Sequence, residues 1–115
     1  MSKLDSRTKR FALRIIRLFQ SLPKSPESKV IGNQLLRSGT SVGAHYQEAT
    51  RARSNAEFIS KIEVGLQELA ETGYWLDLLV ESGIIEPSLL EELRQEAREL
   101  TAIFISISKK VKVEK

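Results

Sequence analysis

The chain has 115 residues, of which 41% are hydrophobic and 29% are charged, and its formal net charge is +3. This length and balance fit one soluble globular domain whose core needs no disulfide or metal. The absence of cysteine excludes disulfides, thiol catalysis and cysteine-based zinc sites. The first residues contain no apolar run typical of a signal peptide, and no stretch is long enough to span a membrane, so we expect a cytoplasmic protein.

The charge is unevenly distributed along the chain. Residues 1–55 carry eleven Lys and Arg against three acidic residues, a net charge of +8, whereas residues 56–115 carry seven against twelve, a net charge of −5. Such asymmetry indicates either a polyanionic partner for the first half or pairing between the two halves. A charged surface that is simply solvated is the third interpretation. The sequence leaves all three open.

The first predicted helix spans residues 5–22, with Asp5 as its cap. Apolar residues recur at helical spacing on one face: Phe11, Ile15, Leu18, Phe19 and Leu22. Much of the remaining surface is basic and carries Arg7, Lys9, Arg10, Arg14 and Arg17. This basic face either contacts phosphates or is solvated.

A second helix is predicted for residues 26–53, with Ser25 as its cap and Pro26 at its first position. Its inward stripe comprises Ile31, Leu35, Ser38, Val42, His45 or Tyr46, and Ala49. Glycine inside a helix costs about 1 kcal/mol relative to alanine. Gly39 and Gly43 therefore indicate that another helix approaches closely here, either within the bundle or from a second subunit.

A capping box, Ser54-Asn55-Ala56-Glu57, predicts the start of a third helix over residues 55–82. We expect a tight helical hairpin at this point, with one kinked long helix as the alternative. The predicted buried seam is Phe58, Ile62, Leu66, Leu69, Gly73, Leu76 and Val80. Apolar residues off this seam, namely Val64, Trp75 and Leu78, predict that the helix is covered on more than one side.

Gly83 suits a left-handed cap after the third helix, and Pro87 begins a fourth helix predicted for residues 87–112. Its expected seam is Leu89, Leu93, Ala97, Leu100, Phe104, Ile107 and Val111. Four amphipathic helices joined by short turns predict a single all-α domain, an up-down-up-down antiparallel four-helix bundle.

No constellation of catalytic or metal-binding residues is evident. His45 is the sole histidine, and the sequence has neither cysteine nor a His-Glu-x-x-His motif. The Glu-x-x-His pairs of di-metal bundles are also absent from the sequence. We expect His45 to be hydrogen-bonded within a helix interface, and Glu68 and Glu71 to bond arginines or backbone. No enzyme activity, cofactor or metal is expected.

Three further arginines lie at or near the ends of the glycine-rich region of the second helix: Arg37, Arg51 and Arg53. Arginine suits bidentate phosphate contact, and it pairs equally well with glutamate between subunits. With the basic face of the first helix, the candidate nucleic-acid-binding residues are Arg7, Arg10, Arg14, Arg17, Arg37, Arg51 and Arg53.

Two stretches of the sequence carry a family resemblance. SVGAHYQEA (41–49), followed by R-S-x-x-E-F (53–58), resembles the S-I-x-x-N-I-x-E-G … R-S-x-x-E-F pattern of bacterial four-helix bundle proteins. These proteins are encoded, among other places, in intervening sequences of large-subunit ribosomal RNA genes. FISKIEVGLQELAETGYWLDLL (58–79) is similar to the F-I-x-K-L-x-x-A-x-K-E-x-x-E-T-x-Y-W-L-x-L-L pattern of the same family.

The resemblance covers roughly residues 10–110, and its most specific part is Glu68-x-x-Glu71-Thr72-x-x-Trp75-Leu76. The chain departs from the family pattern near the end of the second helix. There the family has an asparagine, a glycine and a Gly-Arg pair, where this chain has His45, Ala49 and Arg51-Ala52.

The resemblance implies an antiparallel bundle that assembles as a ring-shaped homopentamer. It also implies kinship with the accessory variability protein of diversity-generating retroelements, a basic pentamer that binds nucleic acid and a reverse transcriptase. Residues expected at the oligomer interface are Gly39, Gly43, His45, Val64, Glu68, Glu71 and Trp75.

The predicted function is a non-enzymatic homo-oligomeric bundle that binds RNA, DNA or a nucleoprotein partner through its basic helix faces. The alternative is a purely structural or protein-interaction assembly with no nucleic-acid role.

Overall fold

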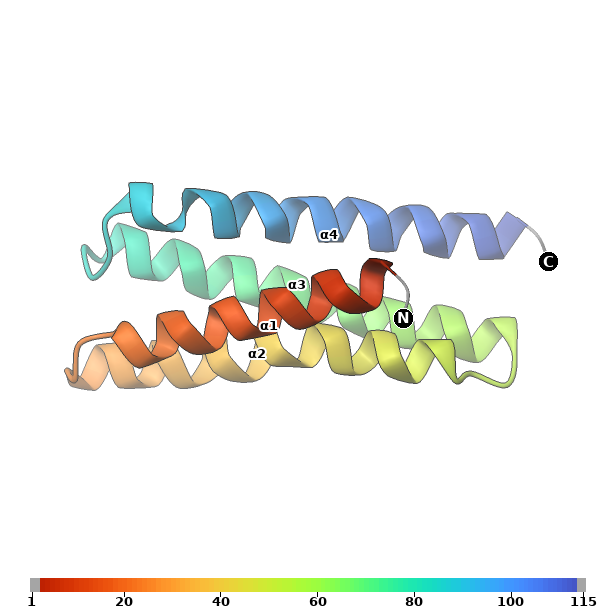
Figure 1. The fold of residues 1–115 in the computed structure, drawn as a ribbon, viewed down its shortest axis with the longest axis horizontal. Helices are drawn as coiled ribbons and strands as arrows, with labels where there is room; N and C mark the ends of the chain where they lie inside the picture. The colour runs from red at the N-terminus through yellow and green to blue at the C-terminus, as the bar shows by residue number, and fades with distance from the viewer. Residues whose placement is uncertain (1–2, 114–115) are drawn as a thin grey trace.

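The structure is a computed structural model that describes residues 3–113. Within this range the chain forms four helices: α1 (Lys3–Ser21), α2 (Pro26–Thr50), α3 (Asn55–Glu81) and α4 (Pro87–Val113). Each helix runs opposite to the one before it, along a molecule of 48 × 22 × 20 Å (Figure 1). The all-α four-helix architecture predicted from the sequence is confirmed.

The turns follow from the capping residues. Ser25 Oγ accepts a hydrogen bond from the Ser28 amide at 3.3 Å, and Ser54 Oγ accepts one from the Glu57 amide at 3.1 Å. Gly83 has a φ of 80°, the left-handed conformation that favours glycine. Because α2 ends at Thr50 and α3 starts at Asn55, the predicted hairpin is confirmed and the kinked long helix is wrong.

One predicted cap is wrong. Asp5 lies within the first described turns of α1, and its carboxylate accepts a hydrogen bond from Gln47 Nε2 of α2 at 2.8 Å. A carboxylate near a helix start has the pattern of a local cap. Here the carboxylate accepts a hydrogen bond from Gln47 on another helix, and the local sequence around Asp5 does not predict this contact.

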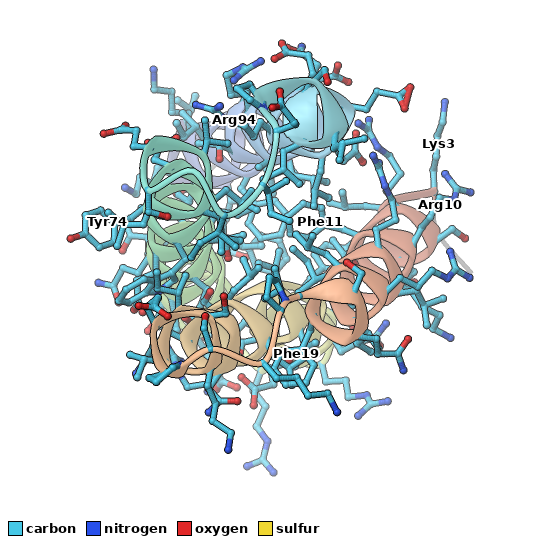
Figure 2. All side chains as sticks on the ribbon, turned by 90° about the vertical axis from the view of Figure 1, so that its left-hand side faces the viewer. Lys3, Arg10, Phe11, Phe19, Tyr74 and Arg94 are labelled. Atoms are coloured by element: carbon cyan, nitrogen blue, oxygen red, sulfur yellow. The ribbon has the colours of Figure 1, made fainter. Side chains whose placement is uncertain are left out.

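Helices adjacent in sequence pack closely, whereas α1 and α4 meet only loosely across the fourth side of the bundle (Figure 2). The core lies between the four helices. Its largest fully buried side chains are Phe11, Phe104, Ile15, Leu35, Ile62, Leu69, Leu76, Leu79, Leu100, Val42, Thr8 and Thr72.

The glycines of α2 allow α1 to approach its backbone. A Cβ at Gly39 would lie 2.7 Å from Cγ1 of Ile15, and one at Gly43 would lie 3.2 Å from Oγ1 of Thr8. Real Cβ atoms essentially never make contacts as short as the first of these. Close packing within the bundle therefore accounts for both glycines without a second subunit.

The buried face of α3 differs from the predicted seam. Ile62, Leu69 and Leu76 are buried as predicted, and the remaining buried positions of the helix are Ile59, Gly65, Glu68, Thr72 and Leu79. Predicted seam members at the edge of this face, namely Phe58, Leu66 and Val80, are only partly buried. A Cβ at Gly65 would lie 2.7 Å from Cε2 of Phe104, so α4 packs against the backbone there. Because the buried face of α3 includes small and polar residues, it differs from the face that the large apolar residues alone predict.

Similar shifts occur on the other two long helices. On α4, Leu90 is buried while Leu89 is 74% exposed, so the predicted first seam position is wrong. On α2, Tyr46 rather than His45 belongs to the core, and its ring lies 6.1 Å from that of Phe104. Of the other large apolar positions predicted for this helix, Leu35 and Val42 are buried, whereas Ile31 is only partly buried.

Candidate nucleic-acid interface

Arg7, the first candidate arginine, is engaged in an ion pair within the chain. Its Nη2 atom lies 2.6 Å from Oε1 of Glu96 and 3.1 Å from Oε1 of Glu99, and Nε donates to the other oxygen of Glu96 at 3.1 Å. The hydrogen bond to Glu96 raises the pKa of Arg7. Because α4 neutralises this guanidinium in a forked geometry, Arg7 ties α1 to α4 instead of standing free for phosphate.

The other three candidates on α1 are Arg10, Arg14 and Arg17. None of them forms an ion pair with any other residue of the range 3–113. Arg10 and Arg17 are exposed, and Arg14 is half-buried. Figure 2 shows Arg10 projecting from the outer side of α1. These positions lie three and four residues apart, so they follow one side of the helix.

Arg37 pairs with the acidic residues of the family-specific stretch of α3. Its Nη1 atom donates to the Glu68 carboxylate at 3.2 Å, and its Nη2 atom donates to Glu71. The hydrogen bond to Glu68 raises the pKa of Arg37. One interpretation of the charge asymmetry was that the two halves of the chain pair with each other. This interpretation is correct for Arg7 and Arg37.

Arg51 and Arg53 lie on the turn between α2 and α3, and both are exposed. They border a shallow hollow together with Glu48, Glu57 and Lys61. Neither forms an ion pair within the described part of the chain. The turn therefore brings two further unpaired guanidinium groups together, at the end of the bundle away from the α1–α2 turn (Figure 1).

His45 lies between two carboxylates on the outer side of α2 and α3. Its Nδ1 atom is 3.0 Å from Oε1 of Glu48, and its Nε2 atom is 3.6 Å from Oε2 of Glu68. The hydrogen bond from His45, with a charge contribution from Lys61, lowers the pKa of Glu48. His45 is therefore hydrogen-bonded within α2 and lies beside Glu68 of α3 in the same chain. Its expected place in an oligomer interface stays a prediction.

The remaining interface candidates lie along α3. Val64 and Trp75 are partly buried, and Glu68 is nearly covered by its own chain. The Trp75 ring packs edge-on against Tyr74 at 5.0 Å, and Tyr74 is 57% exposed. The Trp75 Nε1 atom is buried and has no hydrogen-bond partner in the range 3–113. This part of α3 therefore presents an exposed ring beside a buried unpaired donor.

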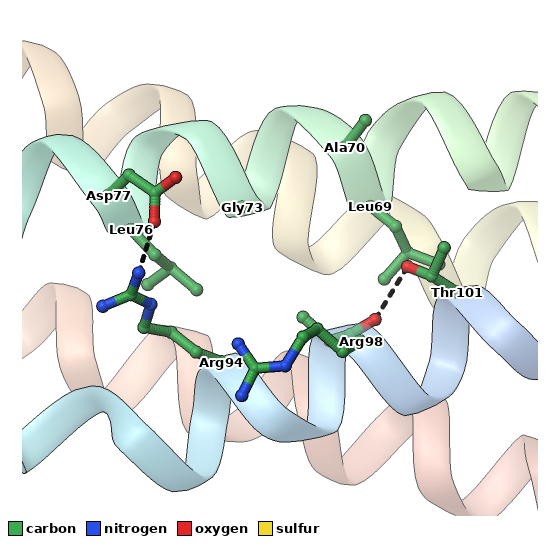
Figure 3. Close-up of a pocket in the computed structure, with 9 residues that line it drawn as sticks. Leu69, Ala70, Gly73, Leu76, Asp77, Arg94, Arg98 and Thr101 are labelled. Carbon is green, nitrogen blue, oxygen red and sulfur yellow. Dashed lines mark hydrogen bonds and ion pairs between the residues drawn. The ribbon is translucent and has the colours of Figure 1, made fainter.

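A groove beside Gly73 was missed by the sequence analysis. It lies between α3 and α4, has a volume of about 330 Å³, and is bridged by Arg94, whose Nη2 atom donates to Oδ1 of Asp77 at 2.7 Å (Figure 3). Nothing lies within 4 Å of a Cβ built on Gly73. Glycine at this position therefore does not serve packing within the chain, contrary to its predicted place in the seam.

The sequence patterns considered above also did not predict the partners of Arg7. Glu92, Glu96 and Glu99 are spaced by four and three residues on α4, which is the spacing of Arg7, Arg10, Arg14 and Arg17 on α1. Matching acidic and basic rows on the first and last helices of a bundle were the signal that could have predicted this pairing.

Two kinds of site are not found among residues 3–113. No group of three or more His, Cys, Asp or Glu side chains there is placed to hold a metal ion. None of the four helices combines the length and the apolar character needed to cross a membrane.

The fold and its charged faces define a small antiparallel helical bundle with paired and unpaired arginines. Residues 3–106 match the family described as 23S rRNA-intervening sequence protein, and the chain belongs to this family. A crystal structure from Bacteroides thetaiotaomicron VPI-5482, described as a protein with unknown function from the S23 ribosomal protein family, is similar to it. The two chains are 38% identical with a TM-score of 0.86, over 91% of this chain and 97% of that one. No curated protein matches the chain.

Proposed function

We propose that the protein is a non-enzymatic helical bundle that binds nucleic acid through Arg10, Arg14 and Arg17 of α1. The observation that carries the proposal is that these three guanidinium groups have no ion-pair partner within residues 3–113, whereas Arg7 and Arg37 do. An unpaired guanidinium keeps all of its donors for phosphate oxygens. The row of three extends over about 10 Å of helix, at about 1.5 Å per residue.

RNA is the first ligand to test. The family is described by its link to 23S rRNA intervening sequences, and the similar crystal structure is assigned to a ribosomal protein family. Both descriptions support RNA over DNA as the polyanion that meets this surface. Arg51 and Arg53, at the other end of the bundle from the α1–α2 turn, offer a second set of contacts to a long strand.

The experiment is a fluorescence anisotropy titration of a labelled RNA oligonucleotide at low salt. The variant Arg10→Glu/Arg14→Glu/Arg17→Glu is expected to lose binding while its circular dichroism remains helical. A control with the same change in net charge, Lys109→Glu/Lys110→Glu/Lys112→Glu, replaces three exposed lysines in the last turns of α4.

We expect the control to retain most of the affinity. If the wild-type protein shows no affinity for RNA or DNA even at low salt, the proposed function is wrong. If the two triple variants lose affinity equally, binding responds to net charge alone and its assignment to α1 is wrong.

We further propose that the bundle works as a homo-oligomer, a ring of five as its resemblance implies. The exposed Tyr74 ring and the open groove beside Gly73 support a partner surface on α3. Light scattering is expected to give five times the 13.0 kDa chain mass. The mass of one chain would refute self-association. An oligomer without affinity for nucleic acid would instead support a structural or protein-interaction assembly.

A further inference from the structure

The side of the bundle between α1 and α4 has one basic and one acidic wall, and we call it the α1–α4 seam. Two hollows of about 640 and 400 Å³ lie along it. The basic wall consists of Lys3, Arg7, Arg10 and Arg14, and the acidic wall of Glu91, Glu92, Glu96 and Glu99. The formal charges of the two walls cancel. The acidic wall on α4 therefore offsets part of the positive charge that the first half of the chain carries.

The four carboxylates of the acidic wall are not equally engaged. Glu96 and Glu99 bind Arg7, and Glu91 lies 3.8 Å from Arg98 of its own helix. Glu92 is exposed and forms no ion pair with any residue from 3 to 113. Its carboxylate therefore lies on the same hollow as Arg10 and Arg14 without being paired to either of them.

We infer that this acidic wall, and Glu92 above all, restrains nucleic-acid binding at α1 by repelling phosphates that approach Arg10 and Arg14. The inference rests on the proposed function and names an electrostatic regulator of the same site. The wall holds the guanidinium groups in a near-neutral environment, so that only a ligand with several adjacent phosphates overcomes the repulsion. Removing the charge of Glu92 strengthens binding without adding any contact to the ligand.

The expected size of the effect follows from Coulomb's law. A carboxylate about 8 Å from a phosphate, in water and at low salt, weakens binding about twofold. We therefore expect Glu92→Gln to tighten binding of the labelled RNA about twofold. Glu91→Gln/Glu92→Gln should tighten it more, but by less than about fourfold, because Arg98 already compensates part of the charge of Glu91. Both effects should shrink at about 0.15 M salt, where the screening length is about 8 Å.

Glu81→Gln is the matched control, because it changes the net charge equally on α3. Figure 2 shows that α3 lies diagonally across the bundle from α1, and Glu81 is exposed. This variant is expected to leave the affinity almost unchanged. A double-mutant cycle then tests whether Glu92 acts through the arginines. In the background Arg10→Gln/Arg14→Gln, the gain from Glu92→Gln should disappear.

The two proposals fail in different ways. If the wild-type protein binds RNA but Glu92→Gln behaves like Glu81→Gln, or keeps its full gain without Arg10 and Arg14, the inference is overturned and the proposed function stands. If neither the wild-type protein nor the Glu91→Gln/Glu92→Gln variant binds RNA at low salt, both are overturned.

Discussion

The close approach of α1 to α2 predicts opposite effects for the same substitution at two glycines. At Gly39, an added Cβ would lie 2.7 and 2.9 Å from Cγ1 and Cγ2 of Ile15. Ile15 is fully buried and β-branched, so these carbons, next to its Cβ, cannot swing away. At Gly73, a Cβ would meet nothing within 4 Å. Gly39→Ala should therefore destabilise the protein and Gly73→Ala should stabilise it.

The magnitudes follow from two opposing terms. Alanine gains about 1 kcal/mol over glycine inside a helix, whereas overpacking a filled core typically costs about 1–3 kcal/mol. Gly73→Ala takes only the gain, so it should raise the free energy of unfolding by about 1 kcal/mol. Gly39→Ala brings both the helix-propensity gain and the overpacking cost. The cost should dominate because the added Cβ would lie too close to two carbon atoms of Ile15. We expect a net loss of about 1 kcal/mol.

Urea unfolding followed by circular dichroism measures both free energies. Thermal unfolding should show a difference of about 8 °C between the variants, at about 4 °C for each kcal/mol in a domain of this size. A Gly39→Ala variant as stable as the wild-type protein would refute the reasoning, since α1 would then not lie against the α2 backbone at Gly39.

Three other predictions concern stability. The hydroxyls of Thr72 and Ser38 lie 3.0 Å apart and both side chains are fully buried, so Thr72→Val should cost about 1–2 kcal/mol in urea unfolding. The double variant with Ser38→Ala should cost less than the two single changes together, and strict additivity would contradict the pairing. Ser54→Ala removes the cap of α3 and should cost about 1 kcal/mol, with Ser54→Asp restoring most of it; an unchanged urea midpoint would count against the cap. The pKa of Glu48 is lowered in the folded state, by His45 above all. Its stabilising contribution is therefore present above the ordinary pKa of 4.5 and lost as pH falls below it. Glu48→Gln should make the fall in urea midpoint below that pH shallower, and an identical pH profile would contradict this.

The fold was largely predictable because its signals are local. Ser25 with Pro26, Ser54 with its capping box, and Gly83 each define a helix end through contacts a few residues apart. The register of burial was less predictable, because Gly65 and Thr72 are buried without being large or apolar. Their burial depends on what faces them, Phe104 and Ser38, and these neighbours are known only once the helices are assembled.

The candidate interface was predictable as a set of arginines but not as a surface. Composition identified a basic first half, and helical spacing placed Arg10, Arg14 and Arg17 on one side of a helix. That Arg7 is neutralised by Glu96, 89 positions along the chain, depends on the side-by-side placement of α1 and α4. The residues around Arg7 contain no information on such a pairing, and only a comparison of the basic row on α1 with the acidic row on α4 could have indicated it.

The salt dependence of RNA binding tests most directly whether Arg10, Arg14 and Arg17 are phosphate contacts while Arg7 is not. For a single-stranded RNA, each phosphate contact contributes about 0.7 to the slope of log K against log salt. We expect Arg10→Gln/Arg14→Gln/Arg17→Gln to lower this slope by about 2 relative to the wild-type protein, and Arg7→Gln to leave it unchanged. An unchanged slope in the triple variant, or an equal reduction in slope per residue in Arg7→Gln, would contradict the proposed interface.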